Sequence, residues 1–221
     1  MEPEERLCPH CRSFERTRHF DLFLKEKDIL NHNSSMLHFA PEFGLEQKLR
    51  SQFRDTYVTT DLLMEGVDRK EDITAMTFSS NSFDFIYCSN VLEHIEDDSS
   101  AIAELFRVLV PGGMAIIQVP IKGKNTYEDP SIVDPIERYK HFGQSDHVRY
   151  YGEDIRDRLS KVGFEVFPFY MLDELSVNDE DIKRMNLGKR ELIHRCQKPK
   201  NGPSDAGVGE APPHDSRPSV R

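Results

Sequence analysis

The feature that most constrains this chain is a regular alternation of short apolar runs with longer amphipathic segments. The apolar runs favour strands and lie at residues 34–41, 56–61, 83–90, 113–120, 165–171 and 191–198. The amphipathic segments have a spacing near 3.6 residues and predict helices at residues 16–30, 44–53, 99–109 and 152–164. Strands that alternate with helices form βαβ units. We therefore predict an α/β fold with a doubly wound, Rossmann-like, mainly parallel sheet.

Local signals set some of the expected boundaries. A serine before Ala101 predicts the start of the helix over residues 99–109, and Pro111-Gly112-Gly113 predicts its end. Gly163 predicts the end of the helix over residues 152–164. Residues 121–151 interrupt the alternation with a long aromatic and charged insertion, and such a loop inside a compact domain is more often functional than idle.

The two ends of the chain differ from the middle. Residues 199–221 are rich in proline, glycine and serine and lack apolar periodicity, so they cannot bury enough surface to offset the entropy of ordering. We expect a disordered tail there, a main domain over residues 16–198, and a short cysteine knuckle over residues 1–15.

Composition excludes several classes of protein. The formal net charge of −10 does not supply the positive field on which non-specific nucleic-acid binding depends. No apolar run approaches the roughly 20 residues that span a bilayer, so we expect no membrane segment. The first residues lack the basic and apolar parts of a secretory signal. Four cysteines in such a chain indicate free thiols and a reducing, cytoplasmic compartment.

In an open α/β sheet, ligands bind beyond the carboxyl ends of the strands. Residues 40–44 form a tight turn after the first predicted strand, and Asp61 follows the second, where a carboxylate can accept both hydroxyls of a ribose. A dehydrogenase is one alternative for such a sheet. It is disfavoured because no GxGxxG sequence follows the first strand to hold a pyrophosphate at a helix N-terminus.

The run DITAMTFSSNSFDFIYCSNVLEHIEDDSSAIAELFRVLVPGGMAIIQVP, residues 72–120, carries a recognisable pattern. It resembles class I S-adenosylmethionine-dependent methyltransferases, of the broad group that includes the ubiquinone-biosynthesis type. The segments LHFAPE, YEDP and DHVRYYG, together with an N-terminal CPxC, resemble an uncharacterised subgroup of the methyltransferase type 11 kind. The resemblance implies a seven-stranded sheet and S-adenosylmethionine as cofactor.

The resemblance also implies roles for particular residues. Asp61 matches the acid that holds the ribose, and Asp72 and Ile73 match the pair that flanks the adenine. Asn90 and Val91 match the residues beside the methionine moiety.

The glycine-rich turn of the family is represented here by residues 38–44. His38 stands at the position of the usual acid, and only Gly44 remains of the glycines. Ala40 is small enough to permit close backbone approach, and Glu42 is a candidate partner for the cofactor's amino group.

Within the insertion, His147 is the candidate catalytic residue, because a neutral imidazole can take a proton from a nucleophile near neutral pH. The alternative for this segment is a solvated, salt-linked loop without a catalytic role. Glu93 and His94 are either a surface pair or a pair near the cofactor or acceptor.

Cys8 and Cys11 have the spacing of a metal knuckle, but a structural zinc site needs four ligands. The pair resembles half of a zinc ribbon, and we expect no complete metal site in this chain. Redox use of the two thiols is less favoured, because no thioredoxin-like strand precedes them.

Together these features predict methyl transfer to an oxygen, nitrogen or carbon nucleophile, most simply on a small molecule. Holding donor and acceptor in line would supply much of the rate acceleration. The alternative is a binding or scaffold protein that kept the methyltransferase fold and lost the chemistry, which the unusual turn at residues 38–44 favours. Neither the acceptor nor the oligomeric state is predicted.

Overall fold

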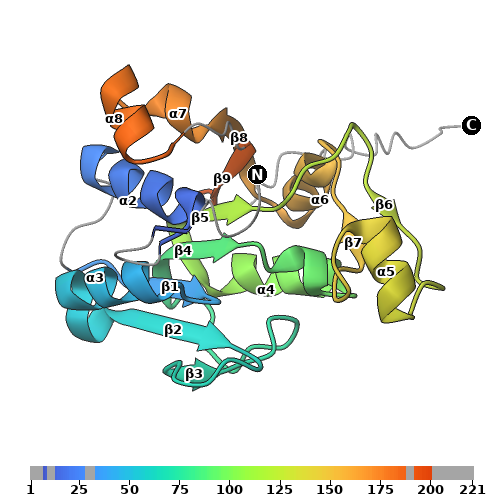
Figure 1. The fold of residues 1–221 in the computed structure, drawn as a ribbon. Helices are drawn as coiled ribbons and strands as arrows, with labels where there is room; N and C mark the ends of the chain where they lie inside the picture. The colour runs from blue at the N-terminus through green and yellow to red at the C-terminus, as the bar shows by residue number, and fades with distance from the viewer. Residues whose placement is uncertain (1–6, 9–12, 28–32, 188–191, 201–221) are drawn as a thin grey trace, which may run out of the picture.

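The computed structural model describes residues 7–8, 13–27, 33–187 and 192–200 (Figure 1). Its centre is a seven-stranded sheet in the order β3-β2-β1-β4-β5-β9-β8. The strands are β1 (Met36–Phe39), β2 (Tyr57–Asp61), β3 (Arg69–Lys70), β4 (Phe83–Ser89), β5 (Leu109–Gln118), β8 (Glu165–Tyr170) and β9 (Leu192–Gln197). Strands β1 to β5 pair in parallel, and β9 runs antiparallel between β5 and β8. The prediction of a mainly parallel, seven-stranded sheet is confirmed.

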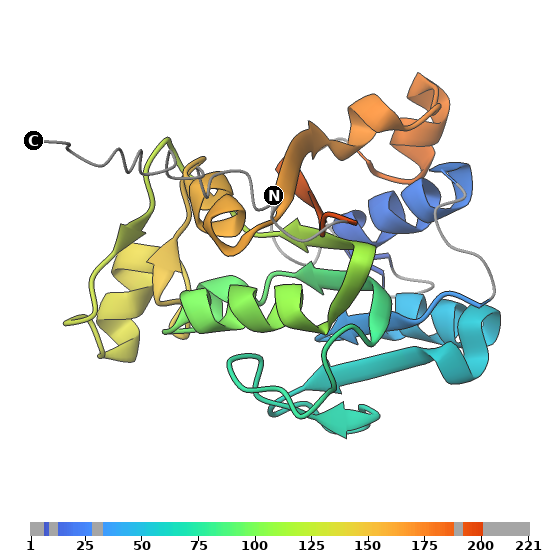
Figure 2. The same cartoon turned by 180° about the vertical axis from the view of Figure 1, so that it is seen from behind.

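Helices cover both faces of the sheet. The helices of the described residues are α2 (Glu15–Lys27), α3 (Phe43–Phe53), α4 (Asp98–Val108), α5 (Pro135–Phe142), α6 (Ile155–Val162), α7 (Met171–Glu174) and α8 (Asp179–Arg184), with single 3-10 turns η1 (Arg54–Thr56) and η2 (Leu92–His94). Apolar residues of α4 and α6 pack on one face of the sheet, and those of α2, α3 and α7 pack on the other. Figure 2 shows the molecule from the side of α4 and α6. The sheet is therefore doubly wound.

Burial on both faces explains why the central strands are almost continuously apolar. In β1, Leu37 and Phe39 join the core under α4 and α6, whereas Met36 joins the core under α2 and α3. On the second face, the ring of Phe20 from α2 stacks on Tyr87 of β4 with 3.7 Å between ring centroids. This packing fixes α2 across the sheet, where its first turn reaches the carboxyl ends of the strands.

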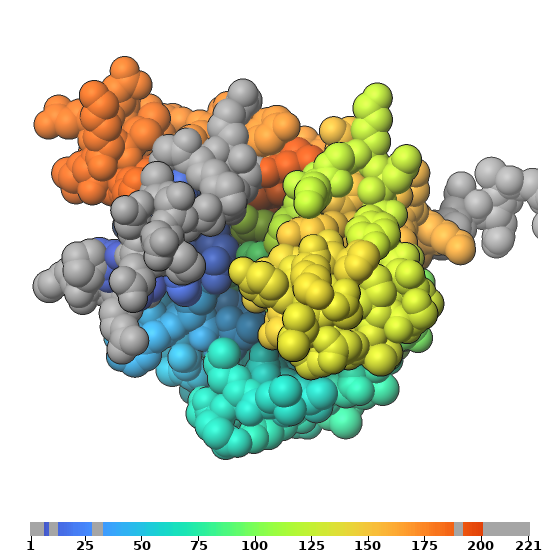
Figure 3. Space-filling view, turned by 45° about the vertical axis from the view of Figure 1, so that its right-hand side comes forward, coloured from blue at the N-terminus to red at the C-terminus, as the bar shows by residue number. Residues whose placement is uncertain are grey.

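The insertion at residues 121–151 is more ordered than a loop. It contains the two-stranded sheet of β6 (Tyr127–Glu128) and β7 (Arg149–Tyr150) and the helix α5. Asp134 caps α5 by accepting the backbone N–H groups of Ile136 and Glu137, and Gly143 ends it at φ +83°. In the space-filling view the insertion forms a yellow-green lobe beside the rest of the molecule (Figure 3).

Two sequence expectations need correction. Asp97, not a serine, caps α4, because its carboxylate accepts the N–H of Ser100. Pro111-Gly112-Gly113 lies within β5 rather than before it, at an irregular stretch of the pairing with β4. A side chain on Gly113 would press on the backbone oxygens of Val110 and Asp84, which explains the glycine there. The short elements β3, α7 and α8 had no clear sequence signal.

The proposed division into residues 1–15, 16–198 and 199–221 stays a prediction. Most of the first segment, including Cys11, lies outside the described residues, as does the sequence from Asn201 onward. Cys88 and Cys196 are buried in β4 and β9, as their strand positions predicted. None of the helices in the described residues has the length and apolarity needed to cross a membrane.

Candidate active site

A cavity of about 550 Å³ opens at the carboxyl ends of β4 and β5. Its walls come from these strand ends, from the first turn of α2, from the insertion and from the facing ends of β8 and β9. The lining residues are Arg16, Asn90, Gln118, Val119, Pro120, Ile121, Phe142, Gly143, Gln144, His147, Tyr150, Glu153, Tyr170 and Leu192. Of the predicted site residues, the structure thus brings Asn90 and His147 to one cavity.

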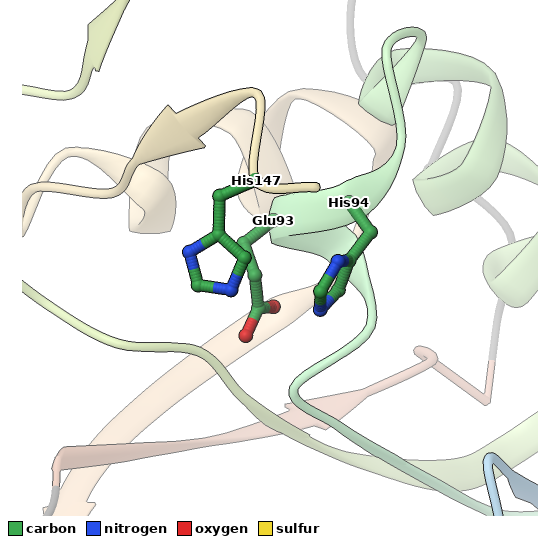
Figure 4. Close-up of side chains that lie close together, drawn as sticks. All are labelled: Glu93, His94 and His147. Carbon is green, nitrogen blue, oxygen red and sulfur yellow. The ribbon is translucent and has the colours of Figure 1, made fainter. Parts of the chain in front are cut away.

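Three titratable side chains meet beside this cavity. Glu93 and His94 lie on η2, directly after β4, and His147 comes from the insertion (Figure 4). One ring nitrogen from each histidine and one carboxylate oxygen of Glu93 all lie within 4.8 Å of one another. The His94 and His147 rings are edge to face with 4.6 Å between centroids. Residues separated by more than fifty positions therefore form one polar cluster, which we call the Glu-His-His cluster.

In each member of the cluster, one polar side-chain atom interacts with a neighbouring residue. The Nδ1–H of His147 donates to the carbonyl oxygen of Phe142 at 3.1 Å, because a carbonyl can only accept. Nε2 of His147 is then unprotonated in the neutral ring, is buried, and has no hydrogen-bond partner among the described residues. Glu93 accepts a hydrogen bond from the side-chain amide of Asn90 at 3.0 Å through Oε1, while its buried Oε2 has no such partner.

Burial changes the protonation of the cluster. Glu93 is 1% exposed, and loss of solvation raises the pKa of its carboxyl to about 7. Burial, followed by the positive charge that His94 can carry, lowers the pKa of His147. At neutral pH His147 is therefore a neutral base. Perturbed groups of this kind that line a cavity are characteristic of functional sites.

Arg149 holds the two halves of the cluster together. Its guanidinium binds Glu128 of β6 at 2.7 Å and donates to the carbonyl oxygens of Leu92, Ile95 and Glu96. These carbonyls belong to the segment that carries Glu93 and His94, whereas Arg149 lies two residues after His147. Val148 adds a backbone hydrogen bond from its N–H to the carbonyl of Glu93 at 2.9 Å. Long-range bonds, rather than a local turn, place His147 opposite Glu93.

The residues expected to bind the nucleoside lie at the ends of β2 and beyond β3. Asp61 accepts the backbone N–H groups of Leu63 and Met64 through Oδ1 at 2.8 and 2.7 Å, and within the described chain Oδ2 has no hydrogen bond. Asp72 is exposed, and its hydrogen bonds from Thr74 lower its pKa. The side chain of Ile73 is buried in the core, so only its backbone could meet an adenine. Asp61 thus has a free carboxylate oxygen for a ribose hydroxyl.

The turn after β1 is built differently from a glycine-rich one. Ala40 adopts φ +47°, a left-handed conformation more typical of glycine, and its N–H bonds to the carbonyl of Thr60. Gly44 lies in the first turn of α3. His38 is 1% exposed, with its ring hydrogen-bonded to the Tyr57 hydroxyl at 2.7 Å, and burial lowers its pKa to about 3. This placement makes His38 a core residue and disfavours direct contact with a cofactor.

Arg16 joins this turn to the cavity. Its guanidinium forms a 2.8 Å salt bridge with Glu42, and the same side chain lines the cavity. Nε of Arg16 and Oε2 of Glu42 have no partner in the described residues. The methionine end of S-adenosylmethionine carries both a carboxylate and an ammonium group, for which an adjacent cation and anion with spare hydrogen-bonding atoms are a suitable pair. The residues present therefore fit the amino-acid end of the cofactor, and the role of Glu42 toward its amino group stays a prediction.

Sequence reasoning missed Arg16 and Gln118, whereas Tyr150 belongs to the insertion that the sequence already marked as functional. Arg16 belongs to a helix that precedes the sheet and has no motif around it. Gln118 could have been found, because it is the last residue of β5 and therefore lies at the ligand-binding edge. Of the two residues that follow β4, Val91 packs partly buried against the core, whereas Asn90 adopts φ +56° and lines the cavity.

Comparison with known proteins agrees with this geometry. Residues 34–117 match the family model described as a methyltransferase domain. A curated relative, the sterol 24-C-methyltransferase of Kluyveromyces lactis, is 31% identical over 117 residues, which cover 51% of this chain and 30% of that protein. The chain thus spans about a third of the length of the curated relative it matches.

Two solved structures show the same fold. A methyltransferase structure from Bacillus halodurans aligns with a TM-score of 0.51 and 18% identity over 80% of this chain and 98% of that one. Phosphoethanolamine N-methyltransferase 2 of Haemonchus contortus, in complex with phosphomonomethylethanolamine and S-adenosylhomocysteine, aligns with a TM-score of 0.55 and 18% identity over 82% of this chain and 53% of that one. The family match and the curated relative support an S-adenosylmethionine-dependent methyltransferase, and the two solved structures show its fold.

Proposed function

We propose that this chain transfers the methyl group of S-adenosylmethionine to a small molecule bound in the cavity at the ends of β4 and β5. One observation carries the proposal: a cavity of about 550 Å³ is lined by Asn90, one of the predicted cofactor residues, and by His147, whose buried Nε2 has no partner within the described chain. Cavities of roughly 300–1,000 Å³ suit small-molecule ligands.

The cofactor supplies an activated methyl group on a positively charged sulfur. Asp61 would accept the ribose hydroxyls through its free Oδ2. Asp72 and the backbone of Ile73 would flank the adenine. Arg16 and Glu42 would hold the amino-acid end, with Ala40 and Gly44 allowing the backbone to approach. Asn90 and Val91 directly follow β4 and would lie beside the methionine moiety of the cofactor. His38 supports the turn from within the core.

The acceptor would lie among Gln118, Tyr150 and Glu153, whose polar groups can orient a nucleophile. His147 lines the cavity, and its unprotonated Nε2 would take the proton of that nucleophile. Walls from the insertion and from α2 exclude water from the reacting groups. In-line positioning then accounts for a large part of the acceleration.

The test is calorimetric titration of the purified full chain with S-adenosylmethionine and S-adenosylhomocysteine. We expect micromolar binding that weakens about 100-fold in Asp61→Ala, because two hydrogen bonds to a charged group contribute about 1.5 kcal/mol or more each. The matched control is Glu65→Ala, an exposed acid in the same β2–β3 connection. An acceptor screen with labelled methyl donor follows positive binding.

Failure of a folded wild-type chain to bind either compound would contradict the proposal. It would favour the alternative of a methyltransferase-fold scaffold. The subgroup with an N-terminal CPxC knuckle and a reducing, cytoplasmic location stay predictions that accompany this proposal.

A further inference from the structure

We infer that the Glu-His-His cluster of Glu93, His94 and His147 is a binding site for one divalent transition-metal ion beside the acceptor cavity. The expectation of no complete metal site concerned only Cys8 and Cys11, because Glu93 and His94 are separated from His147 by 52 positions of intervening chain and were not recognised as a ligand set. The fold removes that separation. Each residue offers one ligand atom, and the three atoms lie within 4.8 Å of one another (Figure 4).

The second polar atom of every ligand is already fixed. His94 directs Nδ1 at the Asp146 carboxylate at 3.2 Å, and His147 donates Nδ1–H to the Phe142 carbonyl at 3.1 Å. Histidines that bind metals usually give their other ring nitrogen to a carboxylate or a carbonyl, which orients the ring and selects the tautomer. Both rings therefore have Nε2 available for an ion. Glu93 is held in the same way through Oε1 by Asn90.

Burial supplies an independent argument. Glu93 is 1% exposed and His147 is 3% exposed, yet Oε2 of Glu93 and Nε2 of His147 have no hydrogen-bond partner in the described chain. Two buried acceptor atoms that face a common space without a donor are costly, because each loses its interaction with water and gains none in return. A cation between them would satisfy both atoms.

The ligand set indicates the class of ion. Two imidazole nitrogens and one carboxylate oxygen suit Zn²⁺ and other first-row divalent metals better than Mg²⁺ or Ca²⁺, which prefer oxygen. Three protein ligands with a fourth position left open are the arrangement of catalytic zinc sites. Ligand atoms about 2.1 Å from such an ion lie about 3.4 Å apart in a tetrahedron, so closing on it requires side-chain movements on the order of 1 Å.

The open position gives the ion a role that rests on the proposed methyl transfer. His147 lines the acceptor cavity, so a ligand in the cavity can reach an ion bound at its Nε2. The acceptor class is then one with a hydroxyl group. Its oxygen would bind the ion and release its proton to solvent, and then bond to the methyl carbon while the carbon–sulfur bond breaks and its electron pair stays on sulfur. When the metal ion is bound, the lone pair on Nε2 of His147 coordinates the ion and therefore does not accept the acceptor's proton.

The test separates this site from the N-terminal thiols. The full chain carrying Cys8→Ser and Cys11→Ser, treated with chelator, is titrated with Zn²⁺ by calorimetry and with Co²⁺ by visible absorption. We expect one equivalent of each ion, a cobalt spectrum without thiolate charge transfer, and affinity at least 100-fold lower in Glu93→Gln and in His147→Asn. His141→Asn is the matched control, since His141 is an exposed histidine of the insertion outside the cluster.

A second measurement needs no substitution in the cluster. Saturating Zn²⁺ should raise the Tm of the Cys8→Ser/Cys11→Ser chain, because a ligand of the native state stabilises it. Absence of binding to this chain, or binding that persists unchanged in both cluster variants, would overturn the inference. Titration with S-adenosylmethionine, with and without Zn²⁺, is run alongside. Loss of cofactor binding alone would count against the proposed methyl transfer and leave the metal site standing.

Discussion

The two halves of the candidate active site are built on different principles. The cofactor half lies at the ends of β1 and β2 and beyond β3, where Asp61 and Asp72 accept hydrogen bonds from backbone groups two or three residues away. The acceptor half lies at the ends of β4 and β5, where Glu93 and His147 are buried and meet only through the insertion. The first half is local and at least partly exposed, whereas the second is assembled from distant segments and desolvated.

The difference has a chemical consequence. In the cofactor half, the hydrogen bonds from the side chain and backbone of Thr74 lower the pKa of Asp72, which favours a carboxylate that can accept hydroxyl groups. Burial in the acceptor half raises the pKa of Glu93 to about 7 and lowers the pKa of His147. Binding chemistry can therefore rest on short motifs, while proton or metal chemistry depends on long-range packing.

The largest effect is expected at Arg149, on which the assembly of the acceptor half depends. Arg149→Met removes the bonds to Glu128 and to the carbonyls of Leu92 and Glu96, and we expect a loss of about 3–5 kcal/mol in the free energy of unfolding. Urea unfolding measures it, with the exposed Arg156→Met as control. A loss below about 1 kcal/mol would show that the insertion is held by other contacts.

Arg16 connects the two halves, so its substitution tests whether they share a ligand. Arg16→Met removes the cation beside Glu42 and leaves a buried carboxylate oxygen without compensation. We expect affinity for S-adenosylmethionine to fall about 30-fold, which corresponds to about 2 kcal/mol. Calorimetry with Lys25→Met, an exposed cation of the same helix, is the control. Unchanged affinity would place Arg16 in the acceptor half alone.

Two glycines of the insertion provide a matched pair. Gly143 and Gly123 have φ of +83° and +82°, but a side chain on Gly143 would overlap the Tyr150 hydroxyl, while one on Gly123 meets nothing within 4 Å. We expect Gly143→Ala to cost about 2 kcal/mol and Gly123→Ala about 1 kcal/mol of the free energy of unfolding. If urea unfolding gave equal losses in the free energy of unfolding for the two variants, Tyr150 would be able to shift away from the new side chain without loss of stability.

The smallest effect concerns His38 in the cofactor half. Its pKa is about 3 in the native state, so the unfolded chain binds a proton at this site that the native state does not, as pH falls below about 6.5. Stability that is present above pH 6.5 is therefore lost with falling pH, by about 1.4 kcal/mol per pH unit from this residue.

Comparing the wild-type chain with His38→Leu between pH 6.5 and 5 isolates this slope, because His147 and His194 contribute to both proteins. Affinity for S-adenosylmethionine should not change in His38→Leu. A loss of affinity would indicate that His38 contributes to the cofactor site, as the family pattern suggested.

Much of the fold was predictable because its signals are local. The apolar strands and the glycine that ends α6 could be predicted from the residues themselves. The candidate positions at the ends of β1, β2 and β4 could be chosen in the same way. The errors also have local causes. Asp97 competes with the serines that follow it as the cap of α4, and Pro111-Gly112-Gly113 has the composition of a turn although its neighbours pair along β4.

The sequence by itself determined the order of strands and helices and the residues at the strand ends, because hydrophobic periodicity and turn chemistry act over a few residues. Only the tertiary structure decided that His147 faces Glu93 and His94, that Arg16 reaches the cavity, and that His38 lies in the core. These placements depend on contacts between segments far apart in the chain. Burial, which sets the protonation of Glu93 and His147, exists only after those segments have packed together.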